Sequence, residues 1–462
     1  YPIATWFIII NELCERFAFY GFKTILSLYL KKYLLFSEDN ATVIVHSFVF
    51  LAYFTPLIGG FLADAVLGKY WTIVILSSIY CLGQMVISVT AIDGLTGTPP
   101  HWWGCVVGLI LVAIGTGGIK SSVSTMGGDQ FKENQTELIA SFFAVFYFSI
   151  NLGSTVSSFV SPIIRTSFGY AVAFAVPAVL LVIATAIFAL GKRWYVIVPP
   201  TGFKNNPLFK FCKVLATAFS LLFKRGNQQP IQDESSETVP LDDEPKNWID
   251  RAVVKHSKKD VYDAKCVWSV CVMLLPIIVF WSLFDQHSSR FVFQAELMDR
   301  KVGTYEFGAD QITTLNPVLI IFLVIIFDRV IYKFLNKFFN LTPLKKISIG
   351  MVIATLSFVC AAIVETFVRM RPHQVHVAWQ IPQYVLLSVG EILVSVTGIE
   401  FAYSQAPKEM KSLMQAYYLL TVSMGNVVVV IVASIPLPEA QFKQVYEFSF
   451  FAFLMIVALV IH

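Results

Sequence analysis

Long apolar stretches, separated by short polar connections, recur from one end of the chain to the other. About twelve of them reach the length of roughly 20 residues that a helix needs to cross a bilayer. They begin near Ile3, Thr42, Thr72, Trp102, Leu138, Ala171, Lys265, Gln311, Lys346, Trp379, Leu413 and Tyr446. This pattern predicts an all-α polytopic membrane protein, because a soluble core cannot bury so much apolar length.

The apolar pattern is interrupted near the middle of the chain. Half of the stretches precede Gly191 and half follow Lys265. We therefore predict two six-helix halves, 1–193 and 264–462, around a central cavity. Two related halves of this kind are typical of the major facilitator architecture.

The linker between the halves, 194–263, is mostly polar. Its centre, 227–244, is rich in Gln, Asp, Glu, Ser and Pro, and we expect it to be disordered. The flanks, 208–223 and 248–261, have helical periodicity with Lys on one side. They predict amphipathic helices at the membrane surface.

Composition agrees with a membrane protein. Hydrophobic residues make up 56% of the chain and charged residues 14%, against about 25% charged in soluble domains. The net charge of +4 is spread over the connections and indicates no nucleic-acid partner. Seven cysteines without paired spacing predict no disulfide framework. The sequence offers no metal-ligand or nucleophile constellation, so we predict neither an enzyme nor a metal site.

The basic residues orient the chain. The connections that follow the even-numbered stretches carry Lys69, Lys132, the group 192–259, the group 333–346, Lys408 and Lys411. The positive-inside rule places these connections and both termini in the cytoplasm. Asn40 then begins a glycosylation sequon on the outside, whereas the sequons at Asn134 and Asn340 fall inside and should stay unmodified.

Three charged residues, Glu12, Glu15 and Arg16, lie inside the first apolar stretch. Each charge in lipid costs at least about 2.5 kcal/mol. Spacings of three and four residues place them on one helical face, where they can pair. Such a cluster favours a protein through which ions or charged solutes pass. The alternative is a structural ion pair that holds two helices together.

The connection after the second stretch reads Gly60-Phe61-Leu62-Ala63-Asp64-Ala65-Val66-Leu67-Gly68-Lys69. Its glycines permit a tight turn and close helix approach, and Asp64 can meet a helix N-terminus in the other half. The segment resembles the loop motif between the second and third spans of major facilitators. The alternative is an ordinary capped loop; the motif implies a role of Gly60, Asp64, Gly68 and Lys69 in gating.

Six further segments follow one another along the chain. They read Glu12-x-x-Glu15-Arg16-Phe17 with Tyr20-Gly21, Gly115-Thr116-Gly117-Gly118-Ile119-Lys120 running to Gly127-Gly128-Asp129-Gln130-Phe131, Phe146-Tyr147-Phe148-Ser149-Ile150-Asn151-Leu152-Gly153-Ser154, Phe280-Trp281 with Phe284-Asp285-Gln286, Asn316-Pro317, and Glu400-Phe401-Ala402-Tyr403-Ser404-Gln405-Ala406-Pro407. Together they resemble the proton-coupled oligopeptide transporters, most closely the animal members. The resemblance covers nearly the whole chain and implies symport of di- and tripeptides, with peptide-like drugs as further candidate substrates.

The two predicted halves differ in the charges that their spans contain. The first half offers Arg16, Lys23 and Lys120 with Glu12 and Glu15, and the second offers Asp285, Asp328, Glu391 and Glu400. A cavity between them would be positive on one wall and negative on the other. The matching solute carries a carboxylate at one end and an ammonium at the other, as a short peptide does.

Specific side chains suit the two ends of such a solute. The fork of Arg16 can bind both carboxylate oxygens, and Lys120 adds a point charge. Glu400 is our candidate for the ammonium, assisted by Asn151 and Asn316. The resemblance implies the same roles. The remaining candidates are Lys23 and Tyr20 for the carboxylate, and Tyr29, Tyr147 and Trp281 for an aromatic pocket. Each position also has a structural alternative, as an interfacial lysine, a hydrogen bond or a packed ring.

Proton coupling needs a group that titrates and changes its partner. His46 has a side chain that ordinarily titrates near physiological pH, and a lone membrane histidine is more often structural. The resemblance implies a coupling histidine here. We predict Asp285, with Ser289 four residues on, as its partner at the outer gate. We expect protonated His46 to leave Asp285, after which protonation of the neighbouring glutamates would free Arg16 for the peptide. No cofactor other than the proton is expected.

The nine-residue spacing of Glu391 and Glu400 places them on opposite faces of a straight helix. They cannot then both face one cavity. We therefore assign Glu391 a structural or gating role.

Several positions depart from the family pattern. Phe19 replaces a usual tyrosine, and Lys23 replaces a usual arginine. Ser269 stands where some animal members have an arginine, and Tyr418 replaces a usual tryptophan. Ser269 leaves Asp328 without that partner. Animal members also carry a large insert between spans nine and ten, where this sequence has only 368–378. That domain is either absent or omitted from the sequence.

Two other classes of function stay open. A major facilitator carrier for nitrate, a drug or an amino acid would keep the fold and change the solute. A membrane receptor or an intramembrane enzyme is the more distant alternative. We expect a monomer in the lipid bilayer, in the plasma membrane.

Overall fold

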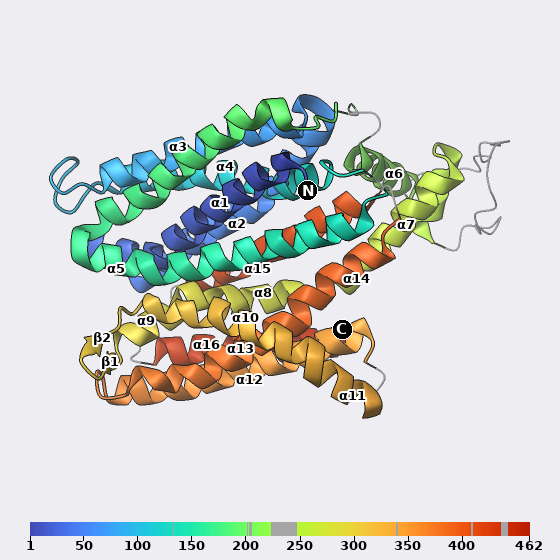
Figure 1. Ribbon diagram of the computed structural model, residues 1–462. Helices are drawn as coiled ribbons and strands as arrows, with labels where there is room; N and C mark the ends of the chain where they lie inside the picture. Colours follow the sequence, from blue (N-terminus) through green and yellow to red (C-terminus); the bar gives the residue numbers. More distant parts are fainter. Residues whose placement is uncertain are drawn as a thin grey trace.

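The computed structural model describes residues 1–132, 134–200, 202, 206–222, 247–338, 341–407, 410–435 and 442–462. Most of these residues are helical. Figure 1 shows the first helices, α1 to α5, in the upper part of the molecule and most later helices, from α8 onward, in the lower part. The linker helix α6 lies at the right-hand end, and strands β1 and β2 lie at the left-hand end, which we call the distal end.

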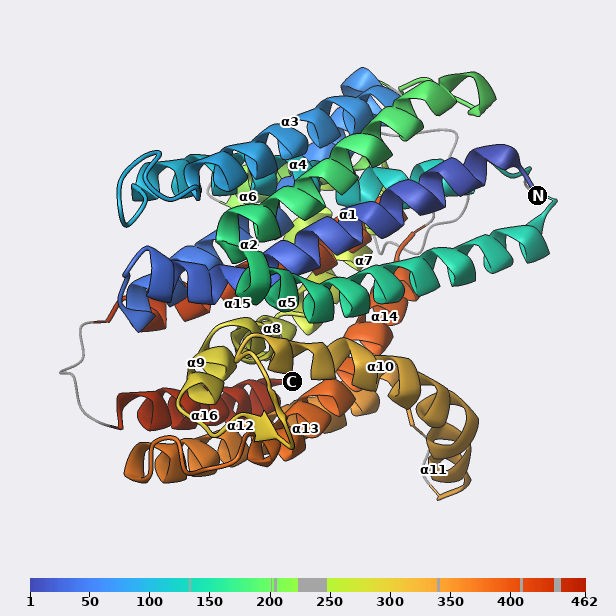
Figure 2. The same cartoon turned by 60° about the vertical axis from the view of Figure 1, so that its left-hand side comes forward.

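The first half contains long helices with short breaks. Its elements are α1 (Ile3–Leu28), η1 (Tyr29–Tyr33), α2 (Glu38–Leu62), η2 (Ala63–Leu67), α3 (Lys69–Thr90), α4 (Trp102–Gly128), α5 (Thr136–Leu190) and η3 (Gly191–Trp194). The hydroxyl of Ser37 caps α2 by accepting from the Asn40 amide. Within α5, Gly169 has φ 84°, which breaks the helix where the sixth span was expected to begin. Figures 1 and 2 both show α1 beside α5.

The second half has more interrupted helices. Its elements are α7 (Lys258–Met273), α8 (Ile277–Phe284), η6 (Asp285–Ser288), α9 (Arg290–Glu296), β1 (Lys301–Val302), β2 (Tyr305–Glu306), η7 (Gln311–Thr314), α10 (Leu315–Ile326), η8 (Phe327–Ile331), α11 (Tyr332–Phe338), α12 (Pro343–Met370), η9 (Val377–Gln380), α13 (Ile381–Glu391), η10 (Ile392–Val396), α14 (Thr397–Gln405), α15 (Lys411–Ala433) and α16 (Lys443–Ile461). The two strands pair antiparallel, with Lys301 opposite Glu306.

The expected spans correspond to helices in this structure. Among the described residues, 9 helices are long and apolar enough to cross a membrane, or up to 10 if the bent pair Lys258–Met273 and Ile277–Glu296 is one span. The other two expected spans are also helical. One is the second span within α5, beyond the break at Gly169, and the other is α1, which carries four charged residues. The prediction of a polytopic helical membrane protein is confirmed.

The linker agrees with the prediction in part. Helix α6 (Pro207–Leu222) occupies the first predicted flank, but the second flank is a 3₁₀ segment, η5 (Trp248–Val254), followed by the start of α7. A single helix does not form there because Ser257 caps a new one by accepting from the Asp260 amide. The apolar sides of α6 and η5 pack together. The polar centre 227–244, which was predicted to be disordered, lies outside the described residues.

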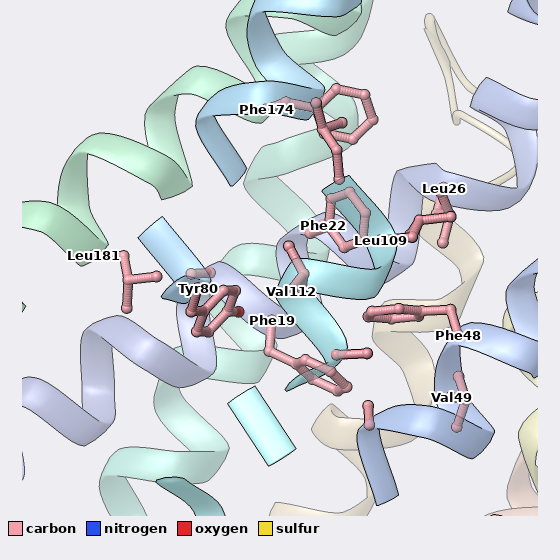
Figure 3. Packing of buried hydrophobic residues seen from close by; sticks show 14 of the residues in the cluster. Phe19, Phe22, Leu26, Phe48, Val49, Tyr80, Leu109, Val112, Phe174 and Leu181 are labelled. Carbon is pink, nitrogen blue, oxygen red and sulfur yellow. The ribbon is translucent and has the colours of Figure 1, made fainter. Parts of the chain in front are cut away.

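Each half has its own buried apolar cluster. Figure 3 shows the first cluster, in which Phe22 of α1 lies between Phe48 of α2 and Phe174 of α5. The ring centroids are 5.6 Å apart for Phe22 and Phe48, and 5.3 Å apart for Phe22 and Phe174. The second cluster is centred on rings of α9, α12 and α16. These clusters hold rigid helix bundles on either side of the charged residues.

Ion pairs join the two halves toward the distal end. They are Lys23–Asp285, Lys31–Glu296, Lys32–Glu296, Arg165–Asp310, Arg290–Asp39, Lys443–Asp39 and Arg369–Glu38. The hydroxyl of Ser27 also donates to the Ser288 carbonyl at 2.7 Å. The halves are therefore closed against each other at the distal end.

Candidate functional site

The charged residues of α1 form the predicted cluster. The guanidinium Nε of Arg16 lies 2.7 Å from Glu12 Oε1 and 2.8 Å from Glu15 Oε2. Glu15 Oε1 accepts a hydrogen bond of 2.6 Å from the Thr116 hydroxyl of α4. All three charged side chains are buried. Among the described residues, no acceptor bonds the two Nη groups of Arg16, which are the groups that bind a carboxylate bidentately.

Lys120 of α4 points at two aromatic rings. Its Nζ lies 4.1 Å from the ring centroid of Phe19 and 3.7 Å from that of Tyr53. This nitrogen is buried and has no hydrogen-bond partner among the described residues. Ring faces attract cations, so Phe19 can support the ammonium although the usual tyrosine hydroxyl is missing. The position of Lys120 leaves its three donors free for a ligand.

Lys23 has a different partner from the one predicted. We expected it to bind substrate carboxylate, but its Nζ forms a buried ion pair of 2.9 Å with Asp285 Oδ1 in the other half. Asp285 Oδ2 accepts from Asn426 Nδ2 at 2.7 Å. Both carboxylate oxygens are therefore occupied, so Asp285 does not contact His46 directly as we had expected.

His46 is completely buried between the halves. Its Nε2 lies 2.9 Å from the Ser289 hydroxyl, as the sequence suggested, and its Nδ1 lies 2.6 Å from Asn426 Oδ1. Because the Asn426 Nδ2 faces the Asp285 carboxylate, its Oδ1 must face the histidine. Nδ1 of neutral His46 therefore donates, and Nε2 accepts from Ser289. One amide connects His46 and Asp285.

The acidic side chains of the second half lie in two settings. Asn316 donates to Glu391 Oε2 at 2.8 Å and to the Ser388 hydroxyl at 3.1 Å. Glu391 also acts electrostatically on Tyr20 and Tyr147 of the first half. Glu400 is exposed on α14, and no hydrogen bond or ion pair joins it to another described residue.

The expected angle between Glu391 and Glu400 is wrong. The residues 392–396 between them form a π-helical turn, η10, not a regular helix. A π turn inserts one residue, which changes the separation from about 180° to about 80° around the axis. The two carboxylates therefore do not lie on opposite faces of the helix. The structural or gating role of Glu391 stays a prediction, but the helix geometry no longer supports it.

The aromatic candidates do not form one pocket. Tyr29 is buried in the first apolar cluster, 5.1 Å from Tyr170 and 5.0 Å from Phe174, and its place in a substrate pocket stays a prediction. Tyr147 is half-exposed, and its carbonyl accepts from Asn151 Nδ2 at 2.9 Å. In the second half, Trp281 lies edge-on to Tyr418, 6.2 Å between centroids.

The gating motif is more helical than expected. Gly60 lies inside α2 and Asp64 lies in the π turn η2, so only Gly68, with φ 76°, makes the predicted turn. Lys69 forms an ion pair with Asp129 of the same half. The helix extends as far as Leu67 because alanine and leucine, which favour helix, alternate with the weaker formers between Leu62 and Leu67.

Sequence reasoning missed two residues of the site. Asn426 is completely buried in α15, and Thr116 is completely buried in α4. An amide inside an apolar span is itself a functional signal, so Asn426 could have been found. Thr116 could not, because a threonine hydroxyl can bond its own helix. In the described part of the chain, no group of three or more His, Cys, Asp or Glu side chains could hold a metal.

Comparison with known proteins adds to this geometry. Residues 70–447 match the POT family. The mouse protein named solute carrier family 15 member 2 is 39% identical over 406 residues, which are 86% of this chain and 54% of that protein. The human solute carrier family 15 member 1 is 30% identical, over 100% of this chain and 92% of that protein. The chain thus spans about half the length of the first curated relatives.

A solved structure has the same fold. The POT family transporter PepTSo superposes with a TM-score of 0.86 at 30% identity, covering 100% of this chain and 97% of that one. The alignment with human member 1 extends over 670 positions, more than the 462 residues here, so that protein has residues without a counterpart. The relatives are named as solute carriers and transporters, which agrees with the prediction that the chain is not an enzyme.

Proposed function

This chain belongs to the POT family, and on that basis we propose that it imports di- and tripeptides together with protons by alternating access. The observation that carries the proposal is Arg16, whose Nε holds two carboxylates while its Nη groups stay unbonded within the described chain. A guanidinium in this arrangement can donate hydrogen bonds from its two Nη groups to a peptide carboxylate. Peptide-like drugs that have the same two charged ends are further candidate substrates.

Lys120 supplies the second positive group for the carboxylate end. It lies in the same electrostatic neighbourhood as Arg16, Glu15 and Lys23. Its unpaired buried ammonium costs free energy that an arriving anion would recover. This favours an anionic group on the solute and supports Arg16 and Lys120 as one binding unit, with Tyr20 close by.

The ammonium end of the peptide falls to the acidic side chains of the second half. Glu400 is unpaired within the described chain, whereas the carboxylate of Glu391 already accepts from Asn316. We assign the ammonium to Glu400, and a gating role to Glu391. Asn151 and Asn316 stay as supporting candidates, and Tyr147 with Trp281 as the walls that accommodate side chains.

Proton coupling is assigned to the connected residues His46, Asn426, Asp285 and Lys23. In this structure they join the halves through the contacts of 2.6 Å, 2.7 Å and 2.9 Å. Protonation of His46 adds a hydrogen to Nε2, so the Ser289 hydroxyl can no longer donate to this nitrogen, and this change favours distal opening. Protonation of Glu12 or Glu15 then releases Arg16 to the peptide, and release of the proton restores the ion pairs.

We further propose that the distal end faces the outside of the plasma membrane, that both termini lie in the cytoplasm, and that the protein works as a monomer. The basic connections support this orientation. Asn40 is exposed in the first turn of α2, near the distal ion pairs, where a glycan would be accessible. A carrier for nitrate, a drug or an amino acid is the alternative, because the fold alone does not fix the solute.

The test is uptake of a labelled dipeptide into proteoliposomes with an inward proton gradient. A driving force of 100 mV gives about 2.3 kcal/mol, or roughly 40-fold accumulation of a neutral solute. We expect Arg16→Lys to lose most uptake and Arg371→Lys, an exposed control, to keep it. His46→Gln should keep dipeptide exchange but lose acid-driven accumulation. Competition of this uptake by nitrate or free amino acids would favour the alternative.

A further inference from the structure

A cavity lies at the distal end, away from Arg16 and Lys120. Its volume is about 260 Å³, and we call it the distal cavity. Lys32, Arg165 and Thr166 of the first half line one side, and Arg300, Glu306 and neighbouring residues of the second half line the other. The central binding residues of the proposed function do not reach it.

The lining of the distal cavity is mostly cationic. Three of its side chains are basic and one, Glu306, is acidic. Two of the bases have anionic partners outside the lining: Arg165 binds Asp310 through Nε and Nη2, both at 2.9 Å, and Lys32 lies 3.1 Å from Glu296. Glu296 also serves Lys31 at 2.7 Å, so one carboxylate is shared between two ammonium groups.

Arg300 has the weakest set of partners. Its Nη1 donates to the Phe307 carbonyl at 3.0 Å, and its Nη2 donates to Glu306 at 3.1 Å. The Glu306 side chain is 56% exposed, so this ion pair contributes little to stability. The Nε of Arg300 is buried and has no partner among the described residues. A buried donor without an acceptor costs about 1–3 kcal/mol.

We propose that the distal cavity binds a small anion through a carboxylate or phosphate group, with Arg300 as its main ligand. Such a group can accept from Arg300 Nη2 as it displaces the exposed Glu306 carboxylate. Arginine matches planar and tetrahedral oxyanions better than lysine does. The volume is well above the roughly 10–15 Å³ that one water molecule needs, so phosphate or a small organic acid can enter.

The position of the cavity gives the anion a structural effect. Because both halves contribute to the lining, a bound anion contacts them together only while the distal end is closed. A ligand that binds one conformation better shifts the population toward it. The anion therefore stabilises the distally closed state. This inference concerns binding and does not depend on which solute the protein carries.

The test uses the full chain in lipid nanodiscs. Binding of inorganic phosphate and of acetate is measured by titration calorimetry at constant ionic strength, with chloride as reference. We expect Arg300→Gln to weaken binding at least about tenfold through loss of a charge-assisted hydrogen bond. The matched control Lys301→Gln removes an exposed charge one residue along and should stay within about twofold of wild type, since it lies outside the cavity.

The two anions separate the possible sources of the ligand. Tighter binding of phosphate favours a phosphate compound, and tighter binding of acetate favours a carboxylic acid; both support the proposal. Equal affinity for chloride, or no change in Arg300→Gln, would overturn it. Arg300→Lys, which keeps the charge and loses the fork, should be intermediate and serves if the glutamine variant does not fold.

Hydrogen–deuterium exchange of the unmodified protein tests the bridging effect. Phosphate should slow amide exchange in 28–33 of the first half and in 300–311 of the second half at the same time. The linker helix α6 should not respond and provides the internal reference. Protection confined to one half would contradict the proposed stabilisation of the closed state.

Discussion

His46 of α2 and Asn426 of α15 join the two halves through a buried hydrogen bond, with 2.6 Å between His46 Nδ1 and Asn426 Oδ1. The amide also donates to Asp285, which pairs with Lys23. A change of charge on the imidazole therefore reaches the ion pair through one side chain. The Asn426 amide lies between His46 and Asp285, which we had expected to contact each other directly.

Substitution Asn426→Ala should loosen the distal contact and lower acid-driven dipeptide accumulation about tenfold. Three buried hydrogen bonds are lost, to His46, Asp285 and the Val422 carbonyl, and a partner left unsatisfied costs about 1–3 kcal/mol. Uptake in proteoliposomes measures the effect. The control is Ser423→Ala on the same helix, which removes a hydrogen bond of 2.9 Å to the Phe50 carbonyl but contacts neither His46 nor Asp285. An equal loss in both variants would argue against a specific coupling role.

The Arg165–Asp310 contact predicts a pH effect outside the spans. Burial raises the pKa of Asp310 above its ordinary value, although Arg165 acts in the opposite direction. The folded protein therefore holds this proton more tightly than the unfolded chain, and the stability from this group is present at low pH and lost as the pH rises through the folded pKa. The attraction between Arg165 and Asp310 depends on pH in the other direction, because protonation of Asp310 at low pH removes its charge.

We expect the melting temperature of the wild type to fall relative to that of Asp310→Asn as the pH rises from about 4 toward neutrality. Scanning fluorimetry of the purified protein follows this difference. Asp93→Asn is the control, because Asp93 accepts a hydrogen bond from Tyr33, which belongs to the same half. Parallel pH profiles of the wild type and Asp310→Asn would refute the assignment.

The two acidic residues around η10 can be separated by kinetics. Glu400→Gln should raise the KM for a dipeptide about tenfold, because a charge-assisted hydrogen bond to the ammonium is lost. It should not further weaken an N-acetylated dipeptide, which has no ammonium. Glu391→Gln should lower the maximal rate and leave KM nearly unchanged. The reverse pattern would exchange the two roles.

Close packing of α2 and α4 predicts a contrast between neighbouring glycines. A Cβ at Gly59 would lie 2.3 Å from Gly118 Cα, whereas one at Gly60 would first meet the Ser121 hydroxyl at 3.3 Å. Gly59→Ala should therefore destabilise the protein by about 1–3 kcal/mol, the usual cost of overpacking. Gly60→Ala should be tolerated because the serine can rotate. Thermal stability in detergent distinguishes them, and similar melting temperatures would show that the helices can separate.

Much of the fold follows from local sequence. The apolar stretches predict the helices because lipid leaves a backbone no other partners, and Glu12 and Arg16 pair because they are four residues apart on α1. The amphipathic helix α6 was found for the same reason. The second linker flank was not, since the capping strength of Ser257 outweighed the periodicity.

The site could be predicted in its residues but not in its pairings. Lys23 and Asp285 are 262 positions apart, and only the packed halves bring them together. Tyr29 has an aromatic side chain with a hydroxyl group, as many pocket residues do, yet its ring packs against those of Tyr170 and Phe174. Long-range partners of this kind depend on helix arrangement, about which periodicity carries no information.

The π turn η10 lets the helix that carries Glu391 and Glu400 absorb a change of chain length. Removing one residue from 392–396 would restore regular i to i−4 bonding and leave the backbone fully hydrogen-bonded. The two glutamates would then be eight residues apart in a regular helix, which again places them about 80° apart around the axis. A deletion here should thus keep the direction of the Glu400 carboxylate, whereas a deletion in a regular α-helical stretch would turn the segment beyond it by about 100°.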